Sequence, residues 1–265
     1  MEAHILANNE IKFKKPPLNE IVFQVIFPEL VGFGGAHIGL FWSEFRDRFP
    51  TIQSAPRVEL AKSFNLANGV LPENRIWLIH KDNSQVIQIQ DDRFMFNWRD
   101  VGEETTYPGF DALYPIFKEY FSAFIDFLES EEKAPKFVTG FELNYVNHIY
   151  PDVWEDWSDI GEIFPAFNWR SNPSPMPDIK GFRYFMQSTL DDDIGELTVT
   201  IDSRTHKKTS SPLVNFEIKV TGGKRELEVE SLDAVFLPAH DGLVDTLVSM
   251  VSEKVRASWN SDGST

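Results

Sequence analysis

The chain has 265 residues, of which 42% are hydrophobic, including 23 Phe and 7 Trp. This apolar content is enough for a packed core, so the composition excludes a largely disordered chain. No apolar run approaches the roughly 20 residues that a membrane-spanning helix needs, and the first residues lack the pattern of a secretory signal. The absence of cysteine excludes disulfides, a thiol nucleophile and zinc bound by cysteine. We therefore expect a cytoplasmic protein that does not enter a membrane.

The formal net charge is −16 and the isoelectric point is about 4.8. Such an acidic chain repels phosphate backbones and anionic lipids, which disfavours binding to nucleic acids and membranes. Solubility is the simplest explanation of the charge. The alternative is a basic protein partner, encoded nearby, that is attracted electrostatically.

The first half contains one complete series of predicted elements. Pro16 and Pro17 end a flexible arm, residues 1–15, and the helix that begins near Phe110 has the clearest apolar stripe in the chain. Phe94, Phe96 and Trp98 alternate along the chain and so share one face, which is typical of a strand. The predicted elements are a strand at 21–27, a helix at 38–49, strands at 57–61, 75–80, 85–90 and 93–98, and a helix at 110–130.

The second half contains a looser version of the same series. Residues 150–177 have no regular pattern and are rich in Trp, Pro, Asp and Glu. The acidic turn at 191–195 indicates a hairpin, and residues 260–265 form a polar tail that we expect to be frayed. The predicted elements are a strand at 136–149, strands at 182–190, 196–203 and 214–220, and a helix at 240–259.

A strand, a helix, several antiparallel strands and a long helix make up the helix-grip order, as in the repeats of TATA-binding-protein-like folds. We predict an α+β protein with two such halves, at residues 16–135 and 136–259. Their strands would join into one antiparallel sheet with both long helices packed on one face. The second copy is degenerate, because the helix at 38–49 has no clear counterpart in it. The analogy concerns the layout alone and does not imply DNA binding.

The chain carries no recognisable catalytic motif. The segment from Gly32 to His37 lies between a strand and a helix, where dinucleotide-binding proteins have a glycine fingerprint. Its third glycine is replaced by His37, and a meander follows in place of parallel βαβ units. No phosphate-binding loop, nucleophile elbow or zinc-protease motif is present. We predict no catalytic residue, no cofactor and no metal site, and a non-catalytic role is favoured over an enzyme.

The densest polar and aromatic cluster lies at residues 152–162. A calcium loop is one interpretation, but the spaced ligands and the central glycine of such loops are missing. Large aromatic residues usually belong to the core, so these Trp residues could close the end of the sheet. The other interpretation is a partner-binding segment, with Trp anchors and an acidic rim that suit a basic partner. The candidate residues are Trp154, Glu155, Asp156, Trp157, Asp159 and Trp169.

Two segments resemble the ends of a family of uncharacterised prokaryotic proteins of similar length that occur sporadically among genomes. Residues 16–27 (PPLNEIVFQVIF) resemble the opening of this family, which begins with Pro-Pro and continues to alternating apolar residues. Residues 240–259 resemble its C-terminal helix, opened by His and closed near a Trp. The resemblance implies no activity and no catalytic residues. The family's patchy distribution among genomes is typical of defence and toxin–antitoxin genes.

The resulting hypothesis is a non-catalytic, cytoplasmic, protein-binding component of a bacterial defence or toxin-neutralising module. Two alternatives from other classes remain. The first is a small-ligand receptor or enzyme with a pocket between the sheet and the helices. The second is a nucleic-acid-binding saddle, which must overcome the negative net charge.

Overall fold

The computed structural model describes residues 13–58, 74–102, 105–151, 154, 157–167, 179–191, 194–206, 209–223 and 231–260. The chain divides into two compact units. The N-terminal unit consists of Glu20–Glu142 and Gly222–Leu232, and the C-terminal unit consists of Met1–Asn19, Leu143–Thr221 and Asp233–Thr265. The predicted domain boundaries stay a prediction. Each unit is described by itself below.

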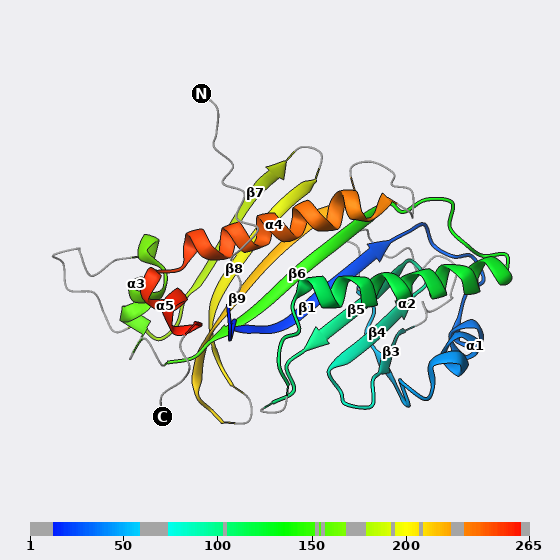
Figure 1. Cartoon of the computed structure of the whole chain (residues 1–265), viewed down its shortest axis with the longest axis horizontal. Coiled ribbons are helices and arrows are strands. Elements are labelled where there is room, and N and C mark those ends of the chain that lie inside the picture. Colours follow the sequence, from blue (N-terminus) through cyan, green and yellow to red (C-terminus); the bar gives the residue numbers. More distant parts are fainter. Residues whose placement is uncertain are drawn as a thin grey trace. The chain divides into compact units, whose positions relative to one another are not determined.

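The N-terminal unit contains five strands and two helices within its described residues (Figure 1). The helix predicted around 110–130 is confirmed. The described strand β2 lies at residues 51–55, whereas the predicted strand at 57–61 extends beyond the described residues. In chain order the elements are β1 (Leu18–Ile26), α1 (Gly35–Phe45), β2 (Thr51–Ala55), β3 (Arg75–Ile79), β4 (Gln85–Gln90), β5 (Arg93–Arg99) and α2 (Phe110–Ser130).

The core of the N-terminal unit lies between α2 and the strands β1 and β5. Phe23 of β1 is fully buried and stacks on Phe117 of α2 with a ring-centroid distance of 5.0 Å. Phe23 and Phe96 are register partners in the antiparallel pair of β1 and β5, and Phe94 lies 5.1 Å from Phe124. The apolar stripe of α2 therefore covers one face of this part of the sheet, as the 3.6-residue period predicts.

The C-terminal unit contains β6 to β9 and several helices (Figure 1). The predicted C-terminal helix at 240–259 differs from the structure. Helix α4 already begins at Asp233 and ends at Met250, and a separate helix follows. The hydroxyl of Ser252 accepts a hydrogen bond from the amide of Val255 and so begins a new helix. The elements are β6 (Gly140–Ile149), η2 (Trp157–Asp159), α3 (Ile160–Ile163), η3 (Pro165–Phe167), β7 (Arg183–Asp191), β8 (Gly195–Thr205), β9 (Pro212–Gly222), α4 (Asp233–Met250) and α5 (Glu253–Ser258).

The strands form one nine-stranded sheet in the order β2-β3-β4-β5-β1-β6-β9-β8-β7. The α+β class with an antiparallel sheet is therefore confirmed. In each half, the first strand neighbours the last strand before the long helix, and the other strands follow outward in reverse chain order. Each long helix also carries a proline at its sixth residue, Pro115 in α2 and Pro238 in α4. The helix-grip description of the two halves stays a prediction.

A close backbone approach in the N-terminal unit requires glycine at two positions. Gly223 has φ +148°, and a Cβ atom there would lie 2.6 Å from the carbonyl oxygen of Thr139. A Cβ atom on Gly140 would lie 2.8 Å from the carbonyl oxygen of Gly222. Both contacts are with backbone atoms, which cannot rotate away as a side chain could.

We expect Gly223→Ala to lower the free energy of unfolding by more than about 1 kcal/mol, because the native conformation cannot accept the methyl group. The control is Gly39→Ala within α1, where an added Cβ meets nothing within 4 Å. That change should stabilise the protein by about 0.5–1 kcal/mol, since alanine favours helix. Urea denaturation of both variants measures the difference, and equal effects would contradict the close approach.

Candidate functional site

The structure brings together two of the predicted partner-binding residues. Trp154 is only 5% exposed, and its ring stacks on that of Trp157 at a centroid distance of 4.6 Å. Trp157 is half-buried and meets the ring of Phe182 edge-on at 5.7 Å. Asp159 ends the short helix η2 and is also half-buried. The predicted residues Glu155, Asp156 and Trp169 lie outside the described residues.

The elements that follow the Trp pair are fixed to the C-terminal unit. The carbonyl oxygen of Ile163 accepts a hydrogen bond from the amide of Ser252 at 2.8 Å. The hydroxyl of Ser252 donates to the carbonyl oxygen of Glu162 at 2.6 Å, and Phe164 packs edge-on against Phe216 of β9 at 5.1 Å. This packing agrees with the interpretation of the Trp residues as part of the core. Partner binding by this segment stays a prediction.

We expect Trp154→Ala to lower the free energy of unfolding by about 3–5 kcal/mol, as other large core truncations do. The matched control is Trp154→Phe, because the indole Nε1 of Trp154 is buried without a hydrogen-bond partner in the described structure. That variant keeps an aromatic ring and should cost less than about 1.5 kcal/mol. Chemical denaturation followed by circular dichroism tests both, and a negligible effect of Trp154→Ala would show that the pair is not core.

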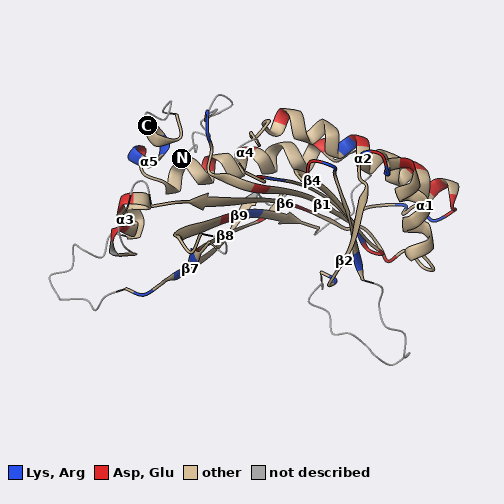
Figure 2. Ribbon diagram, turned by 90° about the horizontal axis from the view of Figure 1, so that it is seen from below, with Lys and Arg blue, Asp and Glu red and all other residues tan. Residues whose placement is uncertain are grey.

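In the C-terminal unit α4 lies over one face of the sheet (Figure 2), and the residues of the other face are polar. The hydroxyl of Tyr145 lies 2.7 Å from Nδ1 of His240 in α4, which assigns Tyr145 to the covered face. Because side chains alternate along a strand, Asn144 lies on the opposite face. The hydrogen bond from Asn144 to Glu217 adds β9 to that face, and the register of β9 with β8 extends it to Thr200 and Asp202. We call it the C-terminal polar face, formed by Asn144, Thr200, Asp202, Asn215 and Glu217.

Two asparagine side chains on the C-terminal polar face are buried with one oxygen unsatisfied. Asn144 is 8% exposed and donates from Nδ2 to Oε1 of Glu217 at 2.8 Å. Asn215 is 1% exposed and donates from Nδ2 to Oδ1 of Asp202 at 3.1 Å. A carboxylate only accepts, so each amide must turn its nitrogen toward the acid. Both Oδ1 atoms are then left without a hydrogen-bond partner in the described ranges.

The sheet of the N-terminal unit also has a polar face, on the side away from α2. Phe94 and Phe96 of β5 face α2, so Arg93, Met95 and Asn97 between and beside them point the other way. In register, Met95 lies between Gln24 of β1 and Gln88 of β4, and Gln88 is the partner of Trp77 on β3. We call it the N-terminal polar face, formed by Gln24, Arg75, Trp77, Gln88, Arg93 and Asn97.

Most polar groups on the N-terminal polar face are paired with each other. Arg93 is 1% exposed, and its Nε and Nη2 donate to the two carboxylate oxygens of Asp92 at 3.0 Å each. Gln88 donates from Nε2 to Oδ1 of Asn97 at 2.7 Å. Asn97 in turn donates to Oε1 of Glu20 at 2.6 Å. These hydrogen bonds offset the cost of burying so many polar side chains.

Three atoms of this face are exceptions to that pairing. Nε of Arg75, Nε1 of Trp77 and Oε1 of Gln88 are buried without hydrogen-bond partners in the part of the chain that the structure describes. The Arg75 guanidinium lies over the Trp77 ring, 5.4 Å from its centroid. Burial lowers the pKa of Arg75, and the positive charge of Arg93 lowers that pKa further. Unsatisfied polar atoms of this kind are rare in native proteins and call for an explanation.

A histidine, an aspartate and a serine meet at the turn between β3 and β4, but their geometry is structural. Nδ1 of His80 and the hydroxyl of Ser84 both lie 2.8 Å from the same oxygen, Oδ1 of Asp82. A catalytic triad needs the serine hydroxyl on the histidine instead. Asp82 also accepts from the amide of Ser84, and Asn83 between them has φ +64°. The three residues form a hydrogen-bonded turn.

The carboxylate of Asp82 should make the stability of this turn depend on pH. Burial raises the pKa of Asp82, but hydrogen bonds from His80 and Ser84 lower it by more, so the folded-state pKa lies below the ordinary value. The stability that Asp82 contributes is therefore present above its unfolded-state pKa and is lost as pH falls through the lower folded-state value. We expect Asp82→Asn to destabilise at neutral pH and to lose this effect in acid. Unfolding measured across that range checks this, with exposed Asp126→Asn on α2 as the control; a pH-independent difference would contradict it.

Within the described ranges, no group of three or more His, Asp and Glu side chains is placed to hold a metal ion. No helix among those ranges combines the length and the apolar character needed to cross a membrane.

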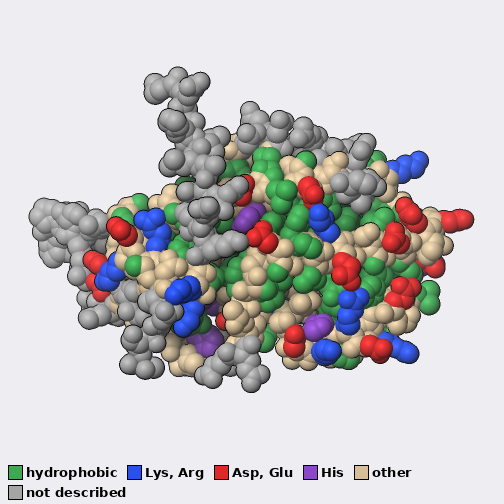
Figure 3. All heavy atoms as spheres, viewed as in Figure 1, with side chains coloured by type: hydrophobic (Ala, Val, Ile, Leu, Met, Phe, Trp, Pro, Cys, Tyr) green, Lys and Arg blue, Asp and Glu red, His purple; other side chains and the backbone are tan. Residues whose placement is uncertain are grey.

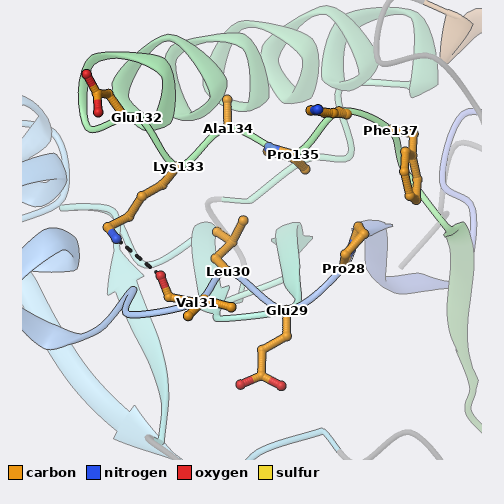
Figure 4. A pocket seen from close by; sticks show the side chains of 10 residues that line it. Pro28, Glu29, Leu30, Val31, Glu132, Lys133, Ala134, Pro135 and Phe137 are labelled. Carbon is orange, nitrogen blue, oxygen red and sulfur yellow. Dashed lines mark hydrogen bonds between the residues drawn. The ribbon is translucent and has the colours of Figure 1, made fainter.

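A hollow of about 420 Å³ lies in the N-terminal unit between the loop after β1 and the turn after α2 (Figure 4). Its lining includes Pro28, Leu30 and Phe137, and the Lys133 ammonium donates to the carbonyl oxygen of Val31 at 3.2 Å. The carboxylates of Glu29 and Glu132 point away from the hollow. Because no convergent polar groups face this space, it lacks the features of a specific ligand site.

The sequence contained a signal for the polar faces that the search for motifs missed. Gln24, Gln88 and Asn97 each lie between two apolar residues of a strand. Such positions predict a second, polar side of the sheet, although sequence alone does not show which of these groups are paired.

Comparison of the chain with family models, with curated proteins and with solved structures found no match. The resemblance of residues 16–27 and 240–259 to a sporadic prokaryotic family stays a prediction.

Proposed function

We propose that the protein is a non-catalytic binding protein that recognises a basic protein partner through the C-terminal polar face. The observation that carries this proposal is the pair of buried, unsatisfied oxygens of Asn144 and Asn215. A buried acceptor without a partner costs about 1–3 kcal/mol. A partner that donates hydrogen bonds to both oxygens would recover that free energy on binding.

The chemistry of this face supports a partner with lysine or arginine side chains. Each unsatisfied oxygen belongs to an amide whose nitrogen is held by a carboxylate, that of Glu217 or that of Asp202. Cationic donors suit such acceptors better than neutral ones, because charge-assisted hydrogen bonds are stronger.

The charge of the chain also supports a basic partner. On α2 the exposed acids Asp111, Glu119, Asp126 and Glu129 outnumber the single basic residue, Lys118. Figure 3 shows acidic side chains gathered over this helix. Together with the net charge of −16, they would accelerate the approach of a basic protein. The family resemblance supports a role in a bacterial defence or toxin-neutralising module.

The other two hypotheses gain less support. In the N-terminal unit the space between the sheet and α2 is filled by aromatic rings, with Phe23 and Phe117 fully buried against each other. A nucleic-acid-binding role would have to overcome the net charge of −16.

We expect the double variant Asn144→Leu, Asn215→Leu to bind its partner at least about tenfold more weakly, because two acceptors are lost. The change also leaves the carboxylates of Glu217 and Asp202 without these amide donors. We therefore expect the free energy of unfolding to fall by about 1–3 kcal/mol for each lost donor, and binding is measured where the variant is folded. The measurement is co-purification with the products of neighbouring genes, followed by titration of the partner that is recovered.

The matched control is Asn147→Leu, the same change on the other face of β6. Asn147 is buried, and its Nδ2 donates to the carbonyl oxygen of Phe216 at 3.1 Å. This variant should lose stability and keep its affinity for the partner. A protein that recovers no partner from its own gene neighbourhood, or a double variant with unchanged affinity, would contradict the proposal.

A further inference from the structure

The three residues that carry the unsatisfied atoms of the N-terminal polar face occupy neighbouring positions on that face. Trp77 and Gln88 are register partners on β3 and β4, which places their Cβ atoms about 4.5–5.5 Å apart. Arg75 precedes Trp77 by two residues on the same strand, so it lies on the same face at roughly 7 Å along the strand. The contact of the Arg75 guanidinium with the Trp77 ring confirms that the two side chains meet.

The Arg75 guanidinium is the cation of this group that makes no ion pair with a described residue, and the negative charge of Glu20 offsets it only in part. The other arginine of the face, Arg93, is neutralised by its two hydrogen bonds with Asp92. Arg75 has no ion pair with any described residue, although it is half-buried. A partly buried cation without an anion is unfavourable. One negatively charged group would therefore balance the charge of this face.

We propose that Arg75, Trp77 and Gln88 bind a carboxylate that carries a hydrogen-bond donor next to it, as in α-hydroxy and α-amino acids. One carboxylate oxygen would accept from Nε of Arg75 and the other from Nε1 of Trp77. The adjacent hydroxyl or amine of the ligand would donate to Oε1 of Gln88. All three unsatisfied atoms are paired in this arrangement.

The charge and the hydrogen-bonding groups of the site favour a carboxylate over a phosphate. A single guanidinium that lacks an ion pair suits one negative charge, whereas a phosphate dianion would need a second cation. The orphan acceptor on Gln88 also requires a donor on the ligand, which an unprotonated phosphate lacks. The guanidinium plane is already supported by the indole ring, so little side-chain freedom is lost on binding.

The test is a titration of the ¹⁵N-labelled full chain with glycolate, acetate and inorganic phosphate, followed by the indole N–H resonance of Trp77. Trp77→Phe assigns that resonance by removing it. We expect glycolate to shift it saturably and acetate to bind several-fold more weakly, because acetate lacks the hydroxyl donor. Arg75→Gln should weaken glycolate binding at least about tenfold, and Gln88→Met should abolish the preference for glycolate over acetate.

Two controls separate binding from folding. Arg46→Gln removes an exposed arginine beside α1 and should leave glycolate binding unchanged. In the absence of ligand, Arg75→Gln should be as stable as the parent protein or more stable, because it removes an unsatisfied cation. A loss of stability in Arg75→Gln would instead show that Arg75 has a structural role, and would overturn the proposal.

The same chemistry occurs at the end of a polypeptide, where a carboxylate follows an amide N–H. An acetylated dipeptide with a free C-terminus, compared with its amidated form, distinguishes this source. Preferential binding of the free form over glycolate would support the site and assign it to a chain end. No shift of Trp77 with any carboxylate, or a shift with phosphate alone, would overturn the proposal. These outcomes are independent of the C-terminal polar face, because the two sites share no residue.

Discussion

The aromatic packing of α2 against β1 and β5 is the interaction on which the N-terminal unit depends. Phe23, at the centre of β1, contacts Phe96 on the neighbouring strand and three rings of the helix. Because side chains alternate along a strand, placing Phe94 and Phe96 on the helix fixes Arg93, Met95 and Asn97 on the other side. A one-residue change of register would turn Arg93, Met95 and Asn97 toward α2 in place of Phe94 and Phe96. The composition of the polar face is therefore set by the same packing that forms the core.

The N-terminal polar face is polar and yet largely buried, whereas polar side chains are usually exposed. Arg93, Gln90 and Asn97 are almost completely buried, and each makes hydrogen bonds within the face or to neighbouring segments. Gln90, for example, accepts from the amide of Val58 and donates to Asp92. The chain thus pairs most of these groups efficiently. Against that background, the unsatisfied atoms of Arg75, Trp77 and Gln88 are exceptions, and the proposed carboxylate would pair all three.

How far the sequence predicts this structure differs from element to element. The helix at Phe110–Ser130 was predictable because its apolar stripe continues through six turns without interruption. Strand β2 was not, since its residues are exposed or nearly so and show no alternation. The break between α4 and α5 was hidden, because Leu247, Val251 and Val255 continue the apolar period across it while Ser252 starts the new helix. The hydrogen bond of one capping side chain therefore begins a new helix where the apolar pattern alone predicts a single continuous helix.

The candidate sites were harder to predict for a different reason. The Trp-rich segment stood out by composition, yet Trp154 is packed against Trp157 as part of the C-terminal unit. Composition identifies large side chains but does not distinguish an anchor for a partner from a core residue. The asparagines and glutamines within the strands carry no motif. Their significance lies in which hydrogen bonds are made and which are missing, and this depends on contacts between strands distant in sequence.

The two polar faces are built from the same order of strands but offer opposite chemistry. On the C-terminal polar face the unsatisfied atoms of Asn144 and Asn215 are both acceptors, and each amide is bonded to a carboxylate. On the N-terminal face two of the three are donors, and one of these belongs to a guanidinium that makes no ion pair with a described residue. A single chemical group cannot satisfy both sets, because cationic donors suit the first and an anion suits the second. The two halves thus share the pairing order of their strands, whereas the unsatisfied groups on their polar faces differ in kind.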